Sequence, residues 1–125
     1  MDDQTVRAAL ERHWAASDAG DFEAEHEIYR GDAVLYYPQS GERIRGRHNI
    51  RESRFVQPNR KRFTLHRIMG SGELWVSEFV LSYDDVPTFS VSIMEFDDGL
   101  VVRETQYFAG RFDPAPSRAH LVERG

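Results

Sequence analysis

The chain has 125 residues, a formal net charge of −5 and no cysteine. This length suits one domain with a single buried core, and the lack of cysteine excludes disulfides and thiolate chemistry. No apolar run approaches the roughly 20 residues that cross a bilayer, and the acidic N-terminus does not resemble a signal peptide. We therefore expect a cytoplasmic protein without membrane contact.

The charge is unevenly distributed along the chain. Residues 43–67 hold nine of the sixteen lysines and arginines and a single acid, Glu52. A basic block can mark a nucleic-acid site. However, the net negative charge of the whole molecule would repel phosphate, and the block lacks a lysine-rich tract. The pattern favours a solvated face or a subunit contact and argues against a nucleic-acid partner.

Two helices are predicted at the N-terminus. Within residues 4–19, Val6, Leu10 and Trp14 recur at steps of four and form an apolar stripe on one helical face. Residues 19–21 end this helix and begin a second one over residues 22–29, which would place Phe22 and Tyr29 on one side. Gly31-Asp32 is predicted to break the second helix.

A strand, a turn and a third helix are predicted next. Residues 33–37 are rich in β-branched and aromatic side chains and precede Pro38, which is typical of a strand that ends there. Ser40-Gly41 predicts a turn, and Ile44 lies in a very short return strand. Residues 47–55 predict a helix with Ile50 and Arg54 on one face.

Four long strands follow, over residues 62–69, 73–83, 88–96 and 100–109. Turns are predicted at residues 70–72 and at Asp98-Gly99, and a loop at residues 84–87. Both faces of the 73–83 strand are apolar, so both should be covered. The tail from Asp113 contains a helical turn near residues 118–123. Helices followed by a meander predict one α+β domain over residues 1–125, with helices packed on a curved antiparallel sheet.

Several segments resemble the nuclear transport factor two-like superfamily, which includes SnoaL-like proteins and ketosteroid isomerases. The N-terminal resemblance is carried by Ala19-Gly20-Asp21-Phe22-Glu23-Ala24, Tyr29, Asp32-Ala33-Val34, Pro38 and Ile44-Arg45-Gly46-Arg47. The C-terminal resemblance is carried by Glu95-Phe96-Asp97-Asp98-Gly99, Val101-Val102, Arg103-Glu104-Thr105-Gln106-Tyr107-Phe108, Phe112 and Arg118-Ala119. The resemblance implies a cystatin-like cone, in which a strongly curved sheet wraps the N-terminal helices and leaves a deep apolar cavity.

A gapless comparison with the isomerase pattern places Tyr37 where the family has its catalytic aspartate. It places His13 at the oxyanion-hole tyrosine and Ser92 near the second oxyanion-hole carboxyl. All three residue types differ from the Asp base and protonated Asp of that enzyme, so steroid isomerisation is not expected. The acid/base aspartate of the SnoaL-like cyclases and the Asp-Arg-Asp set of limonene-type epoxide hydrolases are also missing.

The same comparison predicts which residues face the cavity. On the last strand, Val102, Glu104, Gln106 and Phe108 share one face by alternation. Arg54 and Tyr29 match pocket positions of the isomerases. The predicted interior set is His13, Trp14, Tyr29, Tyr37, Arg54, Ser92, Glu104, Gln106 and Phe108. Whether Tyr36 or Tyr37 faces inward stays open, because a one-residue slip exchanges the two faces of a strand.

Two interpretations of these residues are possible. In the first, Arg54 pairs with Glu104, and His13, Tyr37 and Glu104 perform acid/base catalysis on a small carbonyl compound, since histidine titrates near neutral pH. In the second, the Arg54–Glu104 pair only orders the pocket, and His13 is a satisfied helix histidine. The second interpretation is the favoured one.

We therefore expect a SnoaL-like domain with a mostly apolar cavity for a small molecule. As an enzyme it would be a cofactor-free isomerase, cyclase or hydrolase, and the alternative is a non-catalytic binding or interaction module. No histidine spacing predicts a metal site, and no glycine-rich phosphate loop or Gly-x-Ser-x-Gly elbow is present. Because the strands have two apolar faces, we expect a homodimer through the outer face of the sheet.

Overall fold

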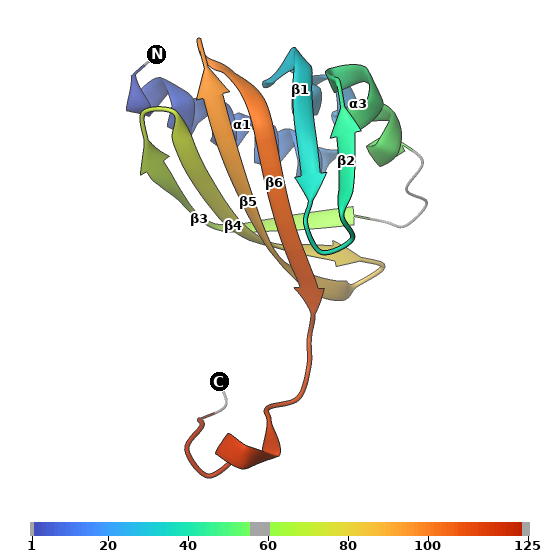
Figure 1. The fold of residues 1–125 in the computed structure, drawn as a ribbon, viewed down its shortest axis with the longest axis vertical. Coiled ribbons are helices and arrows are strands. Elements are labelled where there is room, and N and C mark those ends of the chain that lie inside the picture. The colour runs from blue at the N-terminus through green and yellow to red at the C-terminus, as the bar shows by residue number, and fades with distance from the viewer. Residues whose placement is uncertain (1, 56–60, 124–125) are drawn as a thin grey trace.

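A computed structural model describes residues 2–55 and 61–123. Its elements are α1 (Asp3–Ala19), α2 (Phe22–His26), β1 (Tyr29–Tyr37), β2 (Glu42–Arg45), α3 (Arg47–Phe55), β3 (Lys61–Ser71), β4 (Leu74–Tyr83), β5 (Val86–Asp97), β6 (Leu100–Gly110) and the 3₁₀ turn η1 (Pro116–Arg118). The helices lie on one side of a single curved sheet, as predicted, and the C-terminal tail extends away from it (Figure 1). In the described ranges, no helix combines the length and the apolar character needed to cross a membrane.

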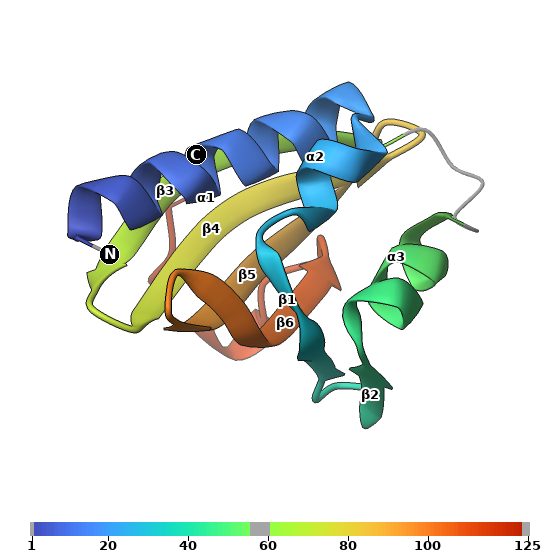
Figure 2. The same cartoon turned by 90° about the horizontal axis from the view of Figure 1, so that it is seen from above.

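Helix α1 follows its sequence prediction closely. Asp2 caps the first turn by accepting a hydrogen bond from the backbone N–H of Thr5 at 2.8 Å. Gly20 ends the helix with a φ of 73°, a left-handed conformation that favours glycine. The predicted stripe of Val6, Leu10 and Trp14 is buried. Figure 2 shows this helix lying across the sheet above β3 and β4.

Helix α2 is shorter than the predicted 22–29 segment and ends at His26. Tyr29 is the first residue of β1, so Phe22 and Tyr29 do not share a helical face. Strand β1 also includes Gly31 and Asp32, which were predicted to lie outside any element. Pairing with β6 decides where α2 ends and β1 begins. Val101 of β6 donates its backbone N–H to the carbonyl of Ile28 at 2.9 Å.

The six strands form one sheet in the order β2-β1-β6-β5-β4-β3. Neighbouring strands are antiparallel, with one exception to the predicted pattern: β1 and β6 run parallel. The register between them shifts between Tyr29 and Val34, which accommodates Gly31-Asp32 as an irregularity within the strand. The pairing begins at Tyr29, three residues after the end of α2, which pairs with Val101 near the start of β6.

The hairpins between the long strands are tighter than predicted. Asp84 and Asp85 have φ of 49° and 69° and connect the paired residues Tyr83 and Val86. Val86 and Pro87 therefore belong to β5 rather than to a loop over 84–87. The predicted Asp98-Gly99 turn is confirmed, with φ of 50° and 82°. The tail forms its helical turn at Pro116–Arg118, earlier than the predicted 118–123.

Candidate active site or ligand pocket

Glu104 lies on β6 inside the cone and is completely buried. The face it occupies depends on a β-bulge, because Glu95 pairs with Arg103 whereas Phe96 pairs with Val101. The extra residue is Val102, which lines a groove on the outer surface beside Val34 and Tyr36. The prediction that Val102 shares the inner face with Glu104 is therefore wrong. Simple alternation holds only beyond the bulge, for Glu104, Gln106 and Phe108.

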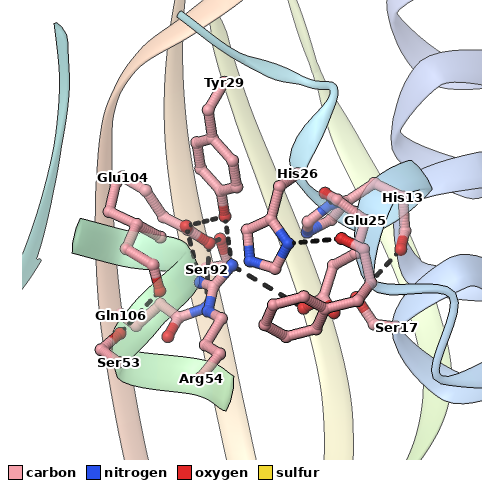
Figure 3. A network of polar contacts seen from close by, with 12 residues as sticks. His13, Ser17, Glu25, His26, Tyr29, Ser53, Arg54, Ser92, Glu104 and Gln106 are labelled. Carbon is pink, nitrogen blue, oxygen red and sulfur yellow. Dashed lines mark hydrogen bonds and ion pairs between the residues drawn. The ribbon is translucent and has the colours of Figure 1, made fainter. Parts of the chain in front are cut away.

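Four side chains donate hydrogen bonds to the Glu104 carboxylate (Figure 3). Tyr29 donates its hydroxyl to Oε1, and Arg54 donates Nη2 to the same oxygen at 3.2 Å. Ser92 and Gln106 donate to Oε2 at 2.6 and 2.9 Å. The donors come from α3 and three strands of the sheet, so the network joins segments that are far apart in sequence.

The network keeps Glu104 ionised inside the protein. Burial by itself would raise the pKa of Glu104. The Arg54 guanidinium opposes this effect of burial, as do the hydrogen bonds from Ser92 and Tyr29, and the pKa of Glu104 lies below its usual value. Burial raises the pKa of the Tyr29 phenol well above its usual value, so Tyr29 acts as a hydrogen-bond donor here.

Arg54 reaches the network from α3, whose Ile50 is buried one turn earlier. Besides Glu104, its guanidinium donates Nη1 to the Tyr29 hydroxyl at 2.9 Å and lies 3.8 Å from a carboxylate oxygen of Glu25. The predicted pairing of Arg54 with Glu104 is thus present. Its side chain is 13% exposed, so the charge is largely withdrawn from water.

His13 is buried on α1 beside this network. Its Nδ1 contacts the backbone carbonyl of Glu25 at 2.6 Å, which assigns the proton to Nδ1. Its Nε2 has no hydrogen-bond partner within the described residues. Burial lowers the pKa of His13 to about 4, although the negative charge of Glu104 acts to raise it. The ring is therefore neutral at physiological pH. His26 of α2 has the same arrangement, with Nδ1 on the carbonyl of Phe22 at 2.7 Å.

A pocket of about 100 Å³ opens next to the network. It is lined by Trp14, Glu25, Tyr37, Arg54, Lys61, Phe63, Phe79, Leu81, Tyr83, Thr88, Ser90, Gln106, Tyr107 and Phe108. Aromatic and aliphatic side chains form most of this wall. The ionisable groups that line it are Glu25, Tyr37, Arg54, Lys61 and the phenols of Tyr83 and Tyr107.

The structure divides the predicted site residues into two groups. Those that line the pocket are Trp14, Tyr37, Arg54, Gln106 and Phe108. Those that lie behind its wall are His13, Tyr29, Ser92 and Glu104, each 1% exposed or less. Tyr37 faces the pocket, whereas Tyr36 lies in the outer groove, so the choice left open by the sequence is resolved. The catalytic roles of His13, Tyr37 and Glu104 stay predictions.

Sequence reasoning missed Glu25, which belongs to the acidic run over residues 23–27 and has the pattern of a solvated face. It also missed the pocket side of β4, where Phe79, Leu81 and Tyr83 alternate with outward-facing residues. Period-two alternation was a usable signal for these three. Glu25 lies three residues after Phe22, on the same face of the helix, and in the folded chain it is buried whereas Glu23 is exposed.

The family model for the SnoaL-like domain matches residues 10–104 of this chain. The chain belongs to the SnoaL-like domain family. The comparison with curated proteins finds no match. Among solved structures, an NTF2-like protein of unknown function from Burkholderia xenovorans shares 48% identity and a TM-score of 0.90, covering 99% of this chain and 98% of that one.

Two further structures place this SnoaL-like domain within the wider fold. A ketosteroid isomerase-like protein from Kribbella flavida shares 28% identity and a TM-score of 0.90, over 100% of this chain and 93% of that one. An LEH-like epoxide hydrolase from M. tuberculosis shares 23% identity and a TM-score of 0.71, over 85% of this chain and 84% of that one. These similarities support the NTF2-like fold, and the cystatin-like description agrees with a further neighbour from Silicibacter pomeroyi.

Proposed function

We propose that this SnoaL-like domain binds a small, mostly apolar molecule in the pocket beside Arg54. The observation that carries the proposal is the composition of the pocket wall. Trp14, Phe63, Phe79 and Leu81 supply apolar surface, and polar groups gather around Arg54. Apolar concave sites with a few convergent polar groups are the common form of small-molecule sites.

The network around Glu104 has a structural role in this proposal. Its carboxylate already accepts four hydrogen bonds, so little acceptor capacity is left for a substrate proton. A buried carboxylate with these donors is rigid, and it holds Arg54 and Gln106 in place at the pocket wall. This arrangement favours a pre-organised binding pocket over a reactive Glu104.

Acid/base catalysis is the second candidate function. The observation in its favour is that Tyr37 and Glu25, two groups able to exchange protons, line the pocket beside the Arg54 cation. Burial raises the pKa of the Tyr37 phenol, so this residue would serve as an acid or hydrogen-bond donor. The reaction would need no cofactor and would be an isomerisation, cyclisation or hydrolysis of the bound molecule.

Toluene is a suitable probe for binding, because the pocket volume is comparable to cavities that hold a single benzene ring. We expect toluene to shift the NMR signals of Trp14, Phe63 and Phe79 in a saturable way. Ser90→Leu should abolish the shifts by filling the pocket, since Ser90 lines it. The matched control is Ser82→Leu on β4, which alternates with the pocket residues Leu81 and Tyr83 and so points to the outer face. Unsaturable shifts, or equal binding by both variants, would contradict the proposal.

The two functions differ in their response to residue changes. In a catalyst, the turnover of a substrate found by screening should depend on pH and fall at least tenfold in Tyr37→Phe. In a binding module, ligand affinity should persist when the proton-exchanging groups are made inert. Unchanged turnover in both His13→Ala and Glu104→Gln would remove these two residues from any acid/base scheme.

A further inference from the structure

Glu25 is a buried, charged residue of the pocket wall that has few partners among the described residues. Its side chain is 4% exposed, and its ion-pair contact in the described residues is Arg54 at 3.8 Å, which is beyond hydrogen-bond distance. Arg54 directs shorter hydrogen bonds to Tyr29 and Glu104. Within residues 2–55 and 61–123, no group donates a hydrogen bond to the Glu25 carboxylate. A buried carboxylate normally accepts several hydrogen bonds, so this one has unused acceptor capacity beside the pocket.

The position of Glu25 is well defined by the elements around it. Asp21 caps α2 by accepting the backbone N–H of Ala24 at 3.2 Å. The ring of His13 holds the backbone carbonyl of Glu25 itself at 2.6 Å. The carboxylate is therefore built into the pocket wall from two sides, rather than placed there by a flexible surface chain.

The surroundings of Glu25 favour a neutral ligand. Among the described residues in and beside the pocket wall, the charges of Glu25 and Glu104 are matched by those of Arg54 and of Lys61, which also lines the pocket. Tyr37 and Tyr83 line the same space and bring their phenol hydroxyl groups to it. The pocket thus offers one strong acceptor beside several donors. A hydroxyl group matches this pattern, because it donates one hydrogen bond and accepts others.

We propose that Glu25 accepts a hydrogen bond from a hydroxyl group of the pocket ligand, which is therefore a small apolar alcohol or phenol. The inference rests on the proposed binding function and specifies its ligand class. The apolar body of the ligand contacts Trp14, Phe63 and Phe79. Its hydroxyl donates to Glu25 and accepts a hydrogen bond from the donors next to it. Glu25 is thus the residue that sets ligand specificity.

The test compares phenol with fluorobenzene, which has nearly the same size and shape but no hydrogen-bond donor. Dissociation constants are measured by NMR titration of the full chain, with benzylamine as a cationic third probe. We expect phenol to bind about tenfold more tightly than fluorobenzene, as is typical of a hydrogen bond to a buried charge. Benzylamine should bind more weakly than phenol, because the charges of the described residues around the pocket are already balanced.

Glu25→Met removes the acceptor and keeps the side-chain length. It should reduce the preference for phenol to less than about twofold while fluorobenzene affinity is kept. Glu23→Met is the matched control on the same helix, at an exposed position outside this pocket, and should keep the full preference. Glu25→Gln retains an acceptor oxygen without the charge, and should fall between wild type and Glu25→Met. This variant keeps the test informative if the methionine variant folds poorly.

The outcomes separate this inference from the proposed function. If neither phenol nor fluorobenzene binds the wild-type protein, the apolar binding pocket itself is refuted, and this inference with it. If both bind equally, or if Glu25→Met keeps the preference for phenol, the pocket stands and the role of Glu25 is wrong. Tighter binding of benzylamine than of phenol would overturn the hydroxyl assignment.

Discussion

At the scale of single residues, the site depends on charges that are buried and paired. Removing one member of such a pair typically costs about 3–5 kcal/mol, because the other charge stays buried without a partner. Within residues 2–55 and 61–123, Glu104 is compensated by Arg54 and three neutral donors, whereas Glu25 is compensated by a single distant contact. The two carboxylates therefore have different roles. We propose that Glu104 stabilises the pocket wall and that Glu25 is available to a ligand.

His13 predicts a specific pH dependence of stability. It binds a proton near pH 6.5 when unfolded but only near pH 4 when folded, because burial disfavours the charged ring. Between these values the unfolded state binds more protons, so the free energy of unfolding falls as the pH decreases, by roughly 3 kcal/mol in total. Chemical denaturation from pH 8 to pH 3.5 measures this loss.

The contribution of His13 is isolated by comparison with His13→Asn, whose amide can replace the Nδ1 donor to the Glu25 carbonyl. This variant should lose less stability across the same pH range, whatever its stability at pH 8. The exposed His66→Asn should follow the wild-type curve. Parallel curves for wild type and His13→Asn would show that His13 protonates normally in the folded protein.

At the scale of elements, close packing at the β3–β4 hairpin supports the concave face of the sheet. A Cβ atom at Gly70 would lie 2.5 Å from the carbonyl oxygen of Leu74 and 2.7 Å from the Cα of Trp75. Both of these neighbours are backbone atoms, so the strands would have to separate. The ring of Trp75 is buried against the core, where displacement is costly.

Gly70→Ala should therefore lower the free energy of unfolding by about 2 kcal/mol, the usual cost of overpacking. Gly31→Ala on β1 is the control, because a Cβ atom there meets nothing within 4 Å. Its stability should stay within about 0.5 kcal/mol of wild type. Urea denaturation of both variants measures the difference, and equal stability of the two would contradict the packing argument.

At the scale of the whole molecule, the outer face of the sheet is more apolar than a solvated surface requires. Met69, Val76 and Ile93 form one row across β3, β4 and β5, and Val80 pairs with Phe89 in another. Met69 and Phe89 are 53% and 46% exposed in the single chain. Phe112 and Leu121 of the tail are exposed as well. We propose that this face is covered by a second copy of the chain.

Sedimentation equilibrium at micromolar concentration should then give about twice the chain mass of 14.5 kDa. Ile93→Lys should shift the protein towards monomer, because it buries a charge at the centre of the contact. Glu11→Lys, at an exposed position of α1 on the opposite side of the sheet, should leave the dimer intact. A wild-type protein that sediments as a monomer would refute the proposal.

The sequence by itself determined the features that depend on neighbouring residues. The start and end of α1, the bounds of α3 and the Asp98-Gly99 turn follow from caps, apolar spacing and backbone conformations that act within a few residues. The α+β class and the curved sheet followed from the order of elements together with the family resemblance. The partnership of Arg54 with Glu104 was predicted by the same route.

Only the tertiary structure decided features that depend on contacts between distant segments. Pairing with Val101 ends α2 early and moves Tyr29 into β1. The bulge at Val102 interrupts the alternation of side chains along β6. As a result, Val101 rather than Val102 is buried on the same face as Glu104. The packing of α2 against α1 and α3 selects Glu25 for the pocket. In each case, a hydrogen bond or packing contact between segments distant in sequence stabilises the observed arrangement. The conformational preferences of neighbouring residues do not encode such contacts.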